Sequence, residues 1–289
     1  MDHSTPALLV VMGTSGCGKS SIGLAVAQAL GIPFVDGDDL HPKENVDKMS
    51  KGVPLTDEVS SSAWGQRGSS VDRRDDSIGF DDSLDISFLV GTQKEQSSGP
   101  TPNATLTPPG CPSQDRIPWL RKIRETAKVL TSPEAVSTMI HPTKPTQEED
   151  PVGALSHALA NVHPASIAPA RERAKGKRRA VVVGCSALRV TYRDILRGKG
   201  DGMDEEEMRT YFIYLHGTRP LLLNRMQHRP GHFFGPGMLD SQLSTLEEPT
   251  PAEENVATIR LGKGKDDAEE IGMERVVAES VEVARSWIG

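Results

Sequence analysis

An apolar run that leads directly into a glycine-rich, lysine-containing loop constrains the fold of this chain more than any other feature. Residues 7–12 (ALLVVM) are all apolar, as expected of a strand buried on both faces of a parallel sheet. Gly13–Ser20 (GTSGCGKS) follows at once and fits the pattern G-x-x-x-x-G-K-[ST] in full. Apolar residues then recur at helical spacing, and Gly31 can end that helix. They are Ile22, Ala25, Val26, Ala29 and Leu30.

This order of strand, loop and helix predicts a phosphate-binding site. Glycines let backbone N–H groups turn inward around phosphates, and the helix N-terminus adds partial positive charge. Lys19 can reach the β- and γ-phosphates, and the Ser20 hydroxyl can bind Mg²⁺. We therefore expect ATP and Mg²⁺ as cofactors. The loop residues expected to contact the nucleotide are Gly13, Thr14, Ser15, Gly16, Cys17, Gly18, Lys19 and Ser20.

The loop pattern alone leaves the reaction open. A glycine-rich turn with a purely structural role is the alternative, and the flanking strand and helix argue against it. The chain lacks the N-K-x-D motif by which GTPases read the base, and it lacks the signature of ABC-type ATPases. A kinase for a nucleoside or a small metabolite remains.

An acidic turn follows the second predicted strand, Ile32–Val35. Its sequence is DGDDLHP, from Asp36 to Pro42. Because ligands of open α/β sheets bind beyond the carboxyl ends of the strands, we expect this turn to face the phosphate site. Asp36 and Asp38 can then divide two tasks, one holding Mg²⁺ and the other orienting or deprotonating an attacking hydroxyl. An acidic surface turn is the alternative reading.

Strands and helices alternate along the rest of the chain, which predicts a three-layer α/β/α fold with a central parallel sheet. Further strands are expected at Ala180–Gly184, Tyr211–Leu215 and Val256–Leu261. A helix should bury Ile117, Leu120, Ile123 and Ala127 on one face, and others should cover Ala187–Arg197 and begin near Pro220. The last helix should bury Val277, Val281, Ala284 and Ile288.

Two stretches lack this alternation of predicted strands and helices. Residues 59–114 are rich in Ser, Gly, Pro and Asp, and residues from about 131 to 179 contain repeated prolines, an acidic patch and a basic cluster. We expect both to be insertions that are disordered or loosely ordered. The remainder has the size of one α/β domain, so residues 1–289 are interpreted as a single interrupted domain.

Composition narrows the class of partner and compartment. The formal net charge is -7, which argues against a general affinity for nucleic acid or anionic membranes. The three cysteines are far apart and lack metal-ligand spacing, which favours a reducing compartment and hence the cytoplasm. No segment has the length of a transmembrane helix. The basic cluster Arg171–Arg179 is read as a solvated linker, with a localisation signal as the alternative.

Several motifs in order make the sequence resemble gluconokinases of the small P-loop type, which are relatives of shikimate kinase. The resemblance covers nearly the whole chain outside the two insertions. The matching segments are Gly13–Ser20, Asp36–Pro42, Asn45–Met49, Gly52–Glu58, Asp115–Leu120, Cys185–Leu188, Tyr192–Arg197, Arg225-Met226, Arg229, Gly231–Phe233, Leu239, Ser241-Gln242 and Leu246–Pro249.

The resemblance implies transfer of phosphate from ATP to D-gluconate, giving ADP and the 6-phospho-D-gluconate that feeds the pentose phosphate pathway. It implies that Asp36 lies on the Mg²⁺ side, that Asp38 orients the acceptor and acts as base, and that Lys19 and Arg229 are catalytic. His41, Arg116 and His232 would contact the sugar acid. A guanidinium suits a carboxylate because it can bind both oxygens.

The R-x-x-x-R-x-G-H-F segment is expected to form a mobile lid, in which Arg225 contacts the nucleotide and Arg229 closes over the phosphates. A solvated helix face is the commoner reading for either arginine alone. Relatives are often dimers, so a homodimer is considered. Two other functions stay open: a kinase for shikimate or another sugar acid, and a nucleotide-binding isoform with impaired catalysis.

The segment 59–114 separates two motifs that are nearly continuous in the family. It opens with Val59-Ser60, which GTGAGT can encode, and closes with Gln114, which CAG can encode. These resemble splice boundaries, and removing the segment restores TDEDRIPWL. Our hypothesis is a translated, unspliced intron, with a family-specific loop as the alternative. Transcripts that uniformly keep the segment, from a gene without such boundaries, would contradict the hypothesis.

Overall fold

The computed structural model describes residues 5–41, 116–140, 153–173, 179–200, 203–228, 236–264 and 269–289. All of them belong to the unit that comprises Met1–Glu58 and Pro112–Gly289. Three sequence features therefore lie outside the described residues: the segment 59–114, the family motifs between residues 42 and 58, and residues 229–233 of the predicted lid. The expectations about them stay predictions.

A five-stranded sheet forms the centre of this unit, and its strand order is β2-β3-β1-β4-β5. All neighbouring strands in it are parallel, as the alternation of strands and helices predicted. The strands are β1 (Ala7–Met12), β2 (Phe34–Asp36), β3 (Ala180–Gly184), β4 (Arg209–His216) and β5 (Val256–Arg260). Because they are parallel, the loops that follow β1, β2 and β3 all lie at the carboxyl ends of the strands.

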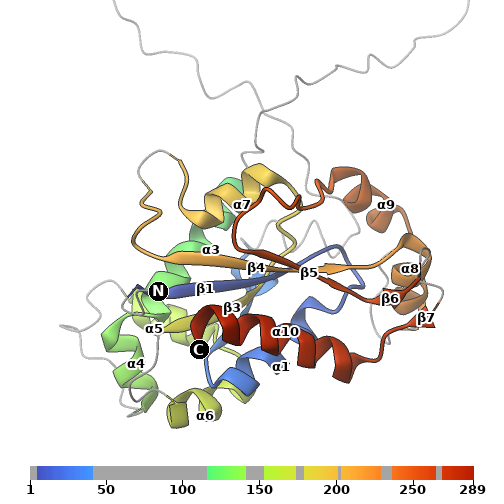
Figure 1. The fold of residues 1–289 in the computed structure, drawn as a ribbon. Helices are drawn as coiled ribbons and strands as arrows, with labels where there is room; N and C mark the ends of the chain where they lie inside the picture. Colours follow the sequence, from blue (N-terminus) through green and yellow to red (C-terminus); the bar gives the residue numbers. More distant parts are fainter. Residues whose placement is uncertain are drawn as a thin grey trace, which may run out of the picture. The chain divides into compact units, whose positions relative to one another are not determined.

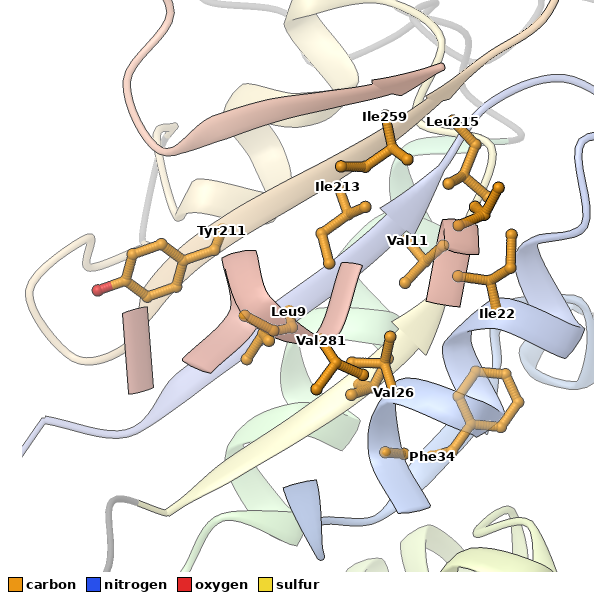
Figure 2. Packing of buried hydrophobic residues seen from close by; sticks show 14 of the residues in the cluster. Leu9, Val11, Ile22, Val26, Phe34, Tyr211, Ile213, Leu215, Ile259 and Val281 are labelled. Carbon is orange, nitrogen blue, oxygen red and sulfur yellow. The ribbon is translucent and has the colours of Figure 1, made fainter. Parts of the chain in front are cut away.

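Successive residues of β1 point to opposite faces, and both faces are buried. Leu9 and Val11 lie in one apolar cluster, whereas Leu8 and Val10 lie in another. Figure 2 shows the first cluster, in which side chains of β1 and β4 lie beside Ile22 of α1. Strands with two buried faces read as continuous apolar runs, which is why 7–12 was recognisable.

Helices cover both faces, so the fold is the expected three-layer α/β/α sandwich (Figure 1). One apolar cluster includes side chains of α1 (Lys19–Leu30), α8 (Arg219–Gln227), α9 (Pro236–Thr245) and α10 (Met273–Ile288). The other includes α3 (Arg116–Leu130), α5 (Ala154–Ala160) and α7 (Val190–Arg197). A two-stranded antiparallel pair, β6 (Gly262–Lys263) and β7 (Glu269–Glu270), precedes α10. No helix in the described ranges is both long and apolar enough to cross a membrane.

Part of the second irregular stretch differs from expectation. The structure forms α4 (Pro133–Ile140), α5 and α6 (Pro164–Arg173) where residues 131–179 were expected to be disordered or loosely ordered. These helices pack: Ala135, Met139 and Leu155 form a small apolar cluster. Each segment is too short for its periodicity to stand out, and tertiary contacts stabilise it. Residues 141–152 and 174–178 lie outside the described residues.

This stretch also protects the edge of the sheet at β2. Val162 forms an isolated antiparallel bridge with Val35, and the buried Ser166 Oγ accepts a hydrogen bond from the Phe34 N–H at 3.0 Å. An edge strand left bare would present unpaired backbone groups to other chains. Residues 162–166 are therefore packed as part of the domain.

Two further differences concern element boundaries and faces. On α1, Ala29 is exposed and Ala27 is buried, the reverse of the predicted apolar stripe. Helices α6 and α10 both contact α1, so the buried face of α1 is wider than predicted and includes Ala27. Helix α7 begins at Val190 rather than near Ala187, because Ala187 adopts a positive φ of 43° that no helix accommodates.

Candidate active site

The phosphate-binding loop connects β1 to α1 as predicted. Gly16 has φ of 82°, and a Cβ atom there would lie 2.8 Å from Met226 Cγ and 2.9 Å from the Leu222 carbonyl oxygen. Glycine is therefore required both for the backbone conformation and for the close packing of α8 on the loop. No side chain caps the N-terminus of α1 at Gly18. Its first N–H groups are oriented as in helix termini that bind anions.

Lys19 and Arg225 both contact the loop backbone. Lys19 Nζ donates to the Thr14 carbonyl oxygen at 3.1 Å, which holds the ammonium group at the mouth of the loop. Arg225 Nη1 lies 3.4 Å from the Cys17 carbonyl oxygen, and its Nη2 lies 2.7 Å from Glu270 Oε1 on β7. The structure thus brings Arg225 to the loop, and its contact with the nucleotide stays a prediction.

Ser20 and Asp36 meet across the edge of the sheet. Ser20 Oγ donates to Asp36 Oδ2 at 2.6 Å, although the two residues come from α1 and β2. Asp36 Oδ1 also accepts a hydrogen bond from the Asp38 N–H at 3.1 Å and so caps the short 3₁₀-helix η1 (Gly37–Leu40). A hydroxyl and a carboxylate are oxygen donors of the kind that Mg²⁺ prefers, and Mg²⁺ commonly keeps water on its other positions. The donor set fits this ion.

The turn that carries Asp38 lies directly against β3. A Cβ atom on Gly37 would overlap the Gly184 carbonyl oxygen, so only glycine allows this approach. Trp119 Nε1 donates to the Gly37 carbonyl oxygen at 2.8 Å and ties the turn to α3. Asp38 is exposed at the tip of this fixed turn, next to Asp39. Asp39 is exposed, but its partial burial, followed by the charge of Asp36, raises its pKa.

His41 closes the same turn and stacks on Trp119. The two ring centroids are 4.0 Å apart with an interplanar angle of 12°. Burial, followed by the positive charges of Arg116 and Lys122, lowers the pKa of His41 to about 4. Its Nδ1 atom is buried without a hydrogen-bond partner among the residues that the structure describes. A neutral imidazole can accept a hydrogen bond at one ring nitrogen and donate one at the other, so the ring can bind a hydroxyl without carrying charge.

Arg116 begins α3 on the same side of the site. Its Nη1 lies 3.3 Å from the Tyr192 hydroxyl oxygen, and its guanidinium carbon lies 5.7 Å from the centroid of that ring. Arg189 approaches the same ring, with its guanidinium carbon at 5.9 Å from the centroid. The acceptor side therefore carries two guanidinium groups around one buried tyrosine, an arrangement suited to an anionic ligand.

The loop between β3 and α7 is held from several directions. Arg193 Nη1 donates to the Ala187 and Leu188 carbonyl oxygens, and Glu247 Oε2 accepts from the Val190 N–H at 2.6 Å. Cys185 in this loop is buried, and its burial raises the pKa of the thiol to about 12. A thiol that stays protonated at neutral pH supports a packing role for Cys185.

The structure thus assembles most of the predicted site at one edge of the sheet. Ser20 and Asp36 are in direct contact, Lys19 is held within the loop by the Thr14 carbonyl oxygen, and Asp38 follows Asp36 on the same turn. Arg229 and His232 lie outside the described residues, so their roles stay predictions.

Sequence reasoning assigned no role to several residues that contact this site. Trp119, Tyr192 and Gln242 occur in the family motifs, which was the signal available for them. No local sequence pattern pointed to Glu270, because it meets Arg225 from far along the chain.

A large cavity lies elsewhere and is not part of this site. It has a volume of about 1060 Å³ and is lined by Arg209 and Asn255 near the amino ends of β4 and β5, the edge opposite the loop. Charged side chains around it neutralise one another, as Arg197 does with Asp194 and Glu253. The site is therefore assigned from its chemistry rather than from cavity size.

Comparison with known proteins agrees with the architecture of the loop and the turn. The model of the shikimate kinase family matches residues 15–58, which include the last six residues of the phosphate loop and the whole acidic turn. A solved structure, a gluconokinase from Sinorhizobium meliloti 1021, superposes with a TM-score of 0.51 at 28% identity. The match covers 98% of this chain and 94% of that one.

Curated sequences extend this similarity across the chain. A probable gluconokinase of Rattus norvegicus is 29% identical over 90% of this chain and 92% of its own length. A probable gluconokinase of Schizosaccharomyces pombe is 27% identical over 91% of this chain and 84% of its own. The thermosensitive gluconokinase of Escherichia coli K12 is 26% identical over 86% and 76%. These similarities confirm the resemblance to gluconokinases over most of the chain.

Proposed function

We propose that this chain is a gluconokinase, which transfers the γ-phosphoryl group of ATP to D-gluconate and releases ADP and 6-phospho-D-gluconate. The observation that carries the proposal is the contact between Ser20 and Asp36 at 2.6 Å, with Asp38 hydrogen-bonded to the same carboxylate. The contact joins the phosphate loop to Asp36, and Asp36 in turn holds the turn that carries Asp38, the proposed acceptor-side carboxylate. The similarity to gluconokinases supplies the acceptor.

In this proposal the loop binds and orients the phosphates. Backbone N–H groups and the ammonium group of Lys19 balance the negative charge that develops during transfer. The acceptor hydroxyl oxygen forms a bond to the γ-phosphorus while the bond from that phosphorus to the β–γ bridging oxygen breaks. The electron pair leaves with ADP, and Asp38 takes the proton of the hydroxyl.

Mg²⁺ would be held through Ser20 and Asp36. When bound, it neutralises charge on the β- and γ-phosphates. Asp36 has a second task that is visible in the contacts: it caps the turn that carries Asp38. A single carboxylate therefore links the metal side of the site to the position of the proposed base.

The acceptor side would recognise a sugar acid. Arg116 offers a guanidinium for the carboxylate, and the neutral His41 offers a ring nitrogen for a hydroxyl. Arg229 and His232 would close over the site from the lid. A homodimer, a cytoplasmic location and the absence of nucleic-acid partners stay predictions from the sequence.

The deciding experiment measures ADP release with and without D-gluconate, and repeats it with Asp38→Asn. We expect gluconate-dependent ADP release that falls by about 10²- to 10⁴-fold in the variant, because the proton acceptor is removed. Asp39→Asn, which changes the neighbouring exposed carboxylate, is the matched control and should retain activity. Undiminished turnover in Asp38→Asn removes Asp38 from the proposed role.

A panel of acceptors separates the alternatives. Preference for shikimate or another sugar acid over gluconate would make the chain a related kinase. If the chain binds ATP but releases ADP with none of the acceptors, it is a nucleotide-binding isoform with impaired catalysis.

A further inference from the structure

One peptide unit of the phosphate loop is held at both of its polar atoms. The Thr14 carbonyl oxygen accepts a hydrogen bond from Lys19 Nζ at 3.1 Å. The Ser15 N–H of the same unit donates to Gln242 Oε1 at 2.6 Å. Gln242 comes from α9, a helix that begins after the predicted lid segment, and it has no role in the chemistry proposed above.

The fold places Gln242 over the loop through two anchors on α9. Leu239 is fully buried in the apolar cluster that also contains side chains of α8. Residues three apart share one face of a helix, so the burial of Leu239 turns Gln242 toward the same side. Asp240 forms a bidentate ion pair with Arg219 at the start of α8, with distances of 2.5 and 3.0 Å. Helix α9 is thus fixed to α8, which itself packs on Gly16 of the loop.

The orientation of the Gln242 amide is determined by its partner. A backbone N–H can only donate, so the atom that faces Ser15 must be the oxygen. Replacing that oxygen by a methyl or thioether group would remove the contact, whereas a carboxylate would keep it. This difference separates acceptance of a hydrogen bond from mere packing.

We infer that Gln242 is a positioning residue for Lys19 and acts through the Thr14–Ser15 peptide. In a trans peptide the N–H and the C=O point in opposite directions. Holding the N–H from one side therefore fixes the direction in which the carbonyl meets the Lys19 ammonium on the other side. A hydrogen bond on the N–H also polarises the carbonyl and strengthens its contact with the cation.

The side chain of Lys19 is then already ordered before the nucleotide binds. A long lysine side chain loses considerable rotamer entropy when it is fixed, and that cost weakens binding unless the group is already held. Gln242 connects α9 with the residue that is expected to contact the β- and γ-phosphates. The inference rests on the proposed function only in taking Mg-nucleotide as the ligand of the loop.

The test uses the full chain and three variants of Gln242. Calorimetry with MgADP should show binding about five-fold weaker for Gln242→Met, the effect of one lost hydrogen bond. Gln242→Glu keeps an accepting oxygen but adds a negative charge near the phosphates, so its affinity should lie between those of wild type and Gln242→Met. Gln242→Ala should resemble the methionine variant. The kcat/KM for MgATP should follow the same order.

Two controls separate positioning from a general effect. Gln28→Met changes a glutamine that also makes one amide contact, to the Ala165 carbonyl oxygen, but on α1 away from the loop, and it should bind MgADP as wild type does. In a Lys19→Met background, Gln242→Met should have no further effect, because the residue acts through Lys19. Thermal unfolding of each variant shows whether the fold is intact.

Three outcomes would overturn the inference. Unchanged MgADP affinity in Gln242→Met would show that the contact does nothing for Lys19. Tighter binding in that variant would show that Gln242 competes with phosphate for the Ser15 N–H. Equal losses in the glutamate and methionine variants would show that acceptance is not the role. MgADP binding requires no acceptor, so these results are independent of whether gluconate is the substrate.

Discussion

His41 illustrates how packing sets the charge state of a single residue. It stacks on Trp119 and lies beside two cations, so burial first and then the charges of Arg116 and Lys122 hold its pKa at about 4. The imidazole is therefore neutral at physiological pH. In the proposed acceptor site it would form a hydrogen bond to a hydroxyl rather than an ion pair with the carboxylate, which leaves the carboxylate to Arg116.

This pKa has a consequence for stability. The pKa of His41 is lowered from 6.5 to about 4, so between these values the unfolded chain binds a proton that the folded chain does not. The free energy of unfolding should therefore fall as the pH drops through this window, by on the order of 3 kcal/mol at pH 4. Urea unfolding of wild type and His41→Gln from pH 4 to 8 measures it. If the free energies of unfolding of wild type and His41→Gln differed by the same amount at every pH, the lowered pKa of His41 would be contradicted.

At the scale of elements, a few side chains fix the turns that form the site. The indole N–H of Trp119 joins α3 to η1 through the Gly37 carbonyl oxygen. Trp119→Phe keeps a ring beside His41 but leaves that carbonyl without its donor. We expect a loss of about 1–3 kcal/mol in stability and a higher KM for gluconate with little change in the KM for MgATP. An equal rise in both constants would indicate a general loosening.

A buried ion pair joins α7 to the turn before β5. Arg193 is fully buried, and its Nη2 and Nε lie 2.5 and 2.8 Å from the two carboxylate oxygens of Glu253. Burial raises the pKa of Glu253, but the hydrogen bonds and charges of Arg193 and Arg197 outweigh it and leave the pKa below 4.5. The stability that Glu253 contributes is therefore present above this pH and lost as the pH falls.

Glu253→Ala should lower the free energy of unfolding by about 3–5 kcal/mol, because it leaves the buried Arg193 guanidinium without its counter-ion. Glu254→Ala removes the neighbouring exposed carboxylate and is the matched control, with little expected effect. The Ala187 and Leu188 carbonyl oxygens also bind Arg193, so activity should fall along with stability. Chemical denaturation gives the first quantity and an ADP assay the second. A loss below about 1 kcal/mol would mean that water replaces the pair.

At the scale of the whole molecule, the segment 59–114 separates the acceptor turn from Arg116. Lengthening a loop costs about 0.6 kcal/mol per doubling, so growth from a few residues to this segment costs roughly 3 kcal/mol. Domains have about 5–15 kcal/mol of stability, so the fold survives such an insertion. Arg116 would be held less well, and a displacement of about 1 Å can cost ~10²-fold in rate.

Deleting residues 59–114 should therefore raise both the midpoint of thermal unfolding and kcat/KM for gluconate. The KM for MgATP should change little, since the loop and α1 lie elsewhere in the sequence. Steady-state kinetics of the full chain and the deletion variant would test this. Equal turnover of the two forms would show that the segment does not disturb the acceptor side.

The sequence alone determined the local elements of the sheet and of the phosphate loop. Strands β1 and β3 begin and end where the apolar runs predicted, and Gly31 ends α1 in the left-handed conformation. These features are readable because buried parallel strands are continuously apolar and because only glycine adopts such a turn without strain. The resemblance to a known family supplied the expected roles of Asp36 and Asp38.

Only the tertiary structure decided how distant residues meet. Gln242 binds Ser15, and Glu270 binds Arg225, although neither pair is close in sequence. The three helices between residues 131 and 179 form because neighbouring elements bury their short apolar faces. Local patterns record the periodicity of one segment at a time. The order of strands in the sheet, which no local pattern records, determines which of these segments become neighbours at the site.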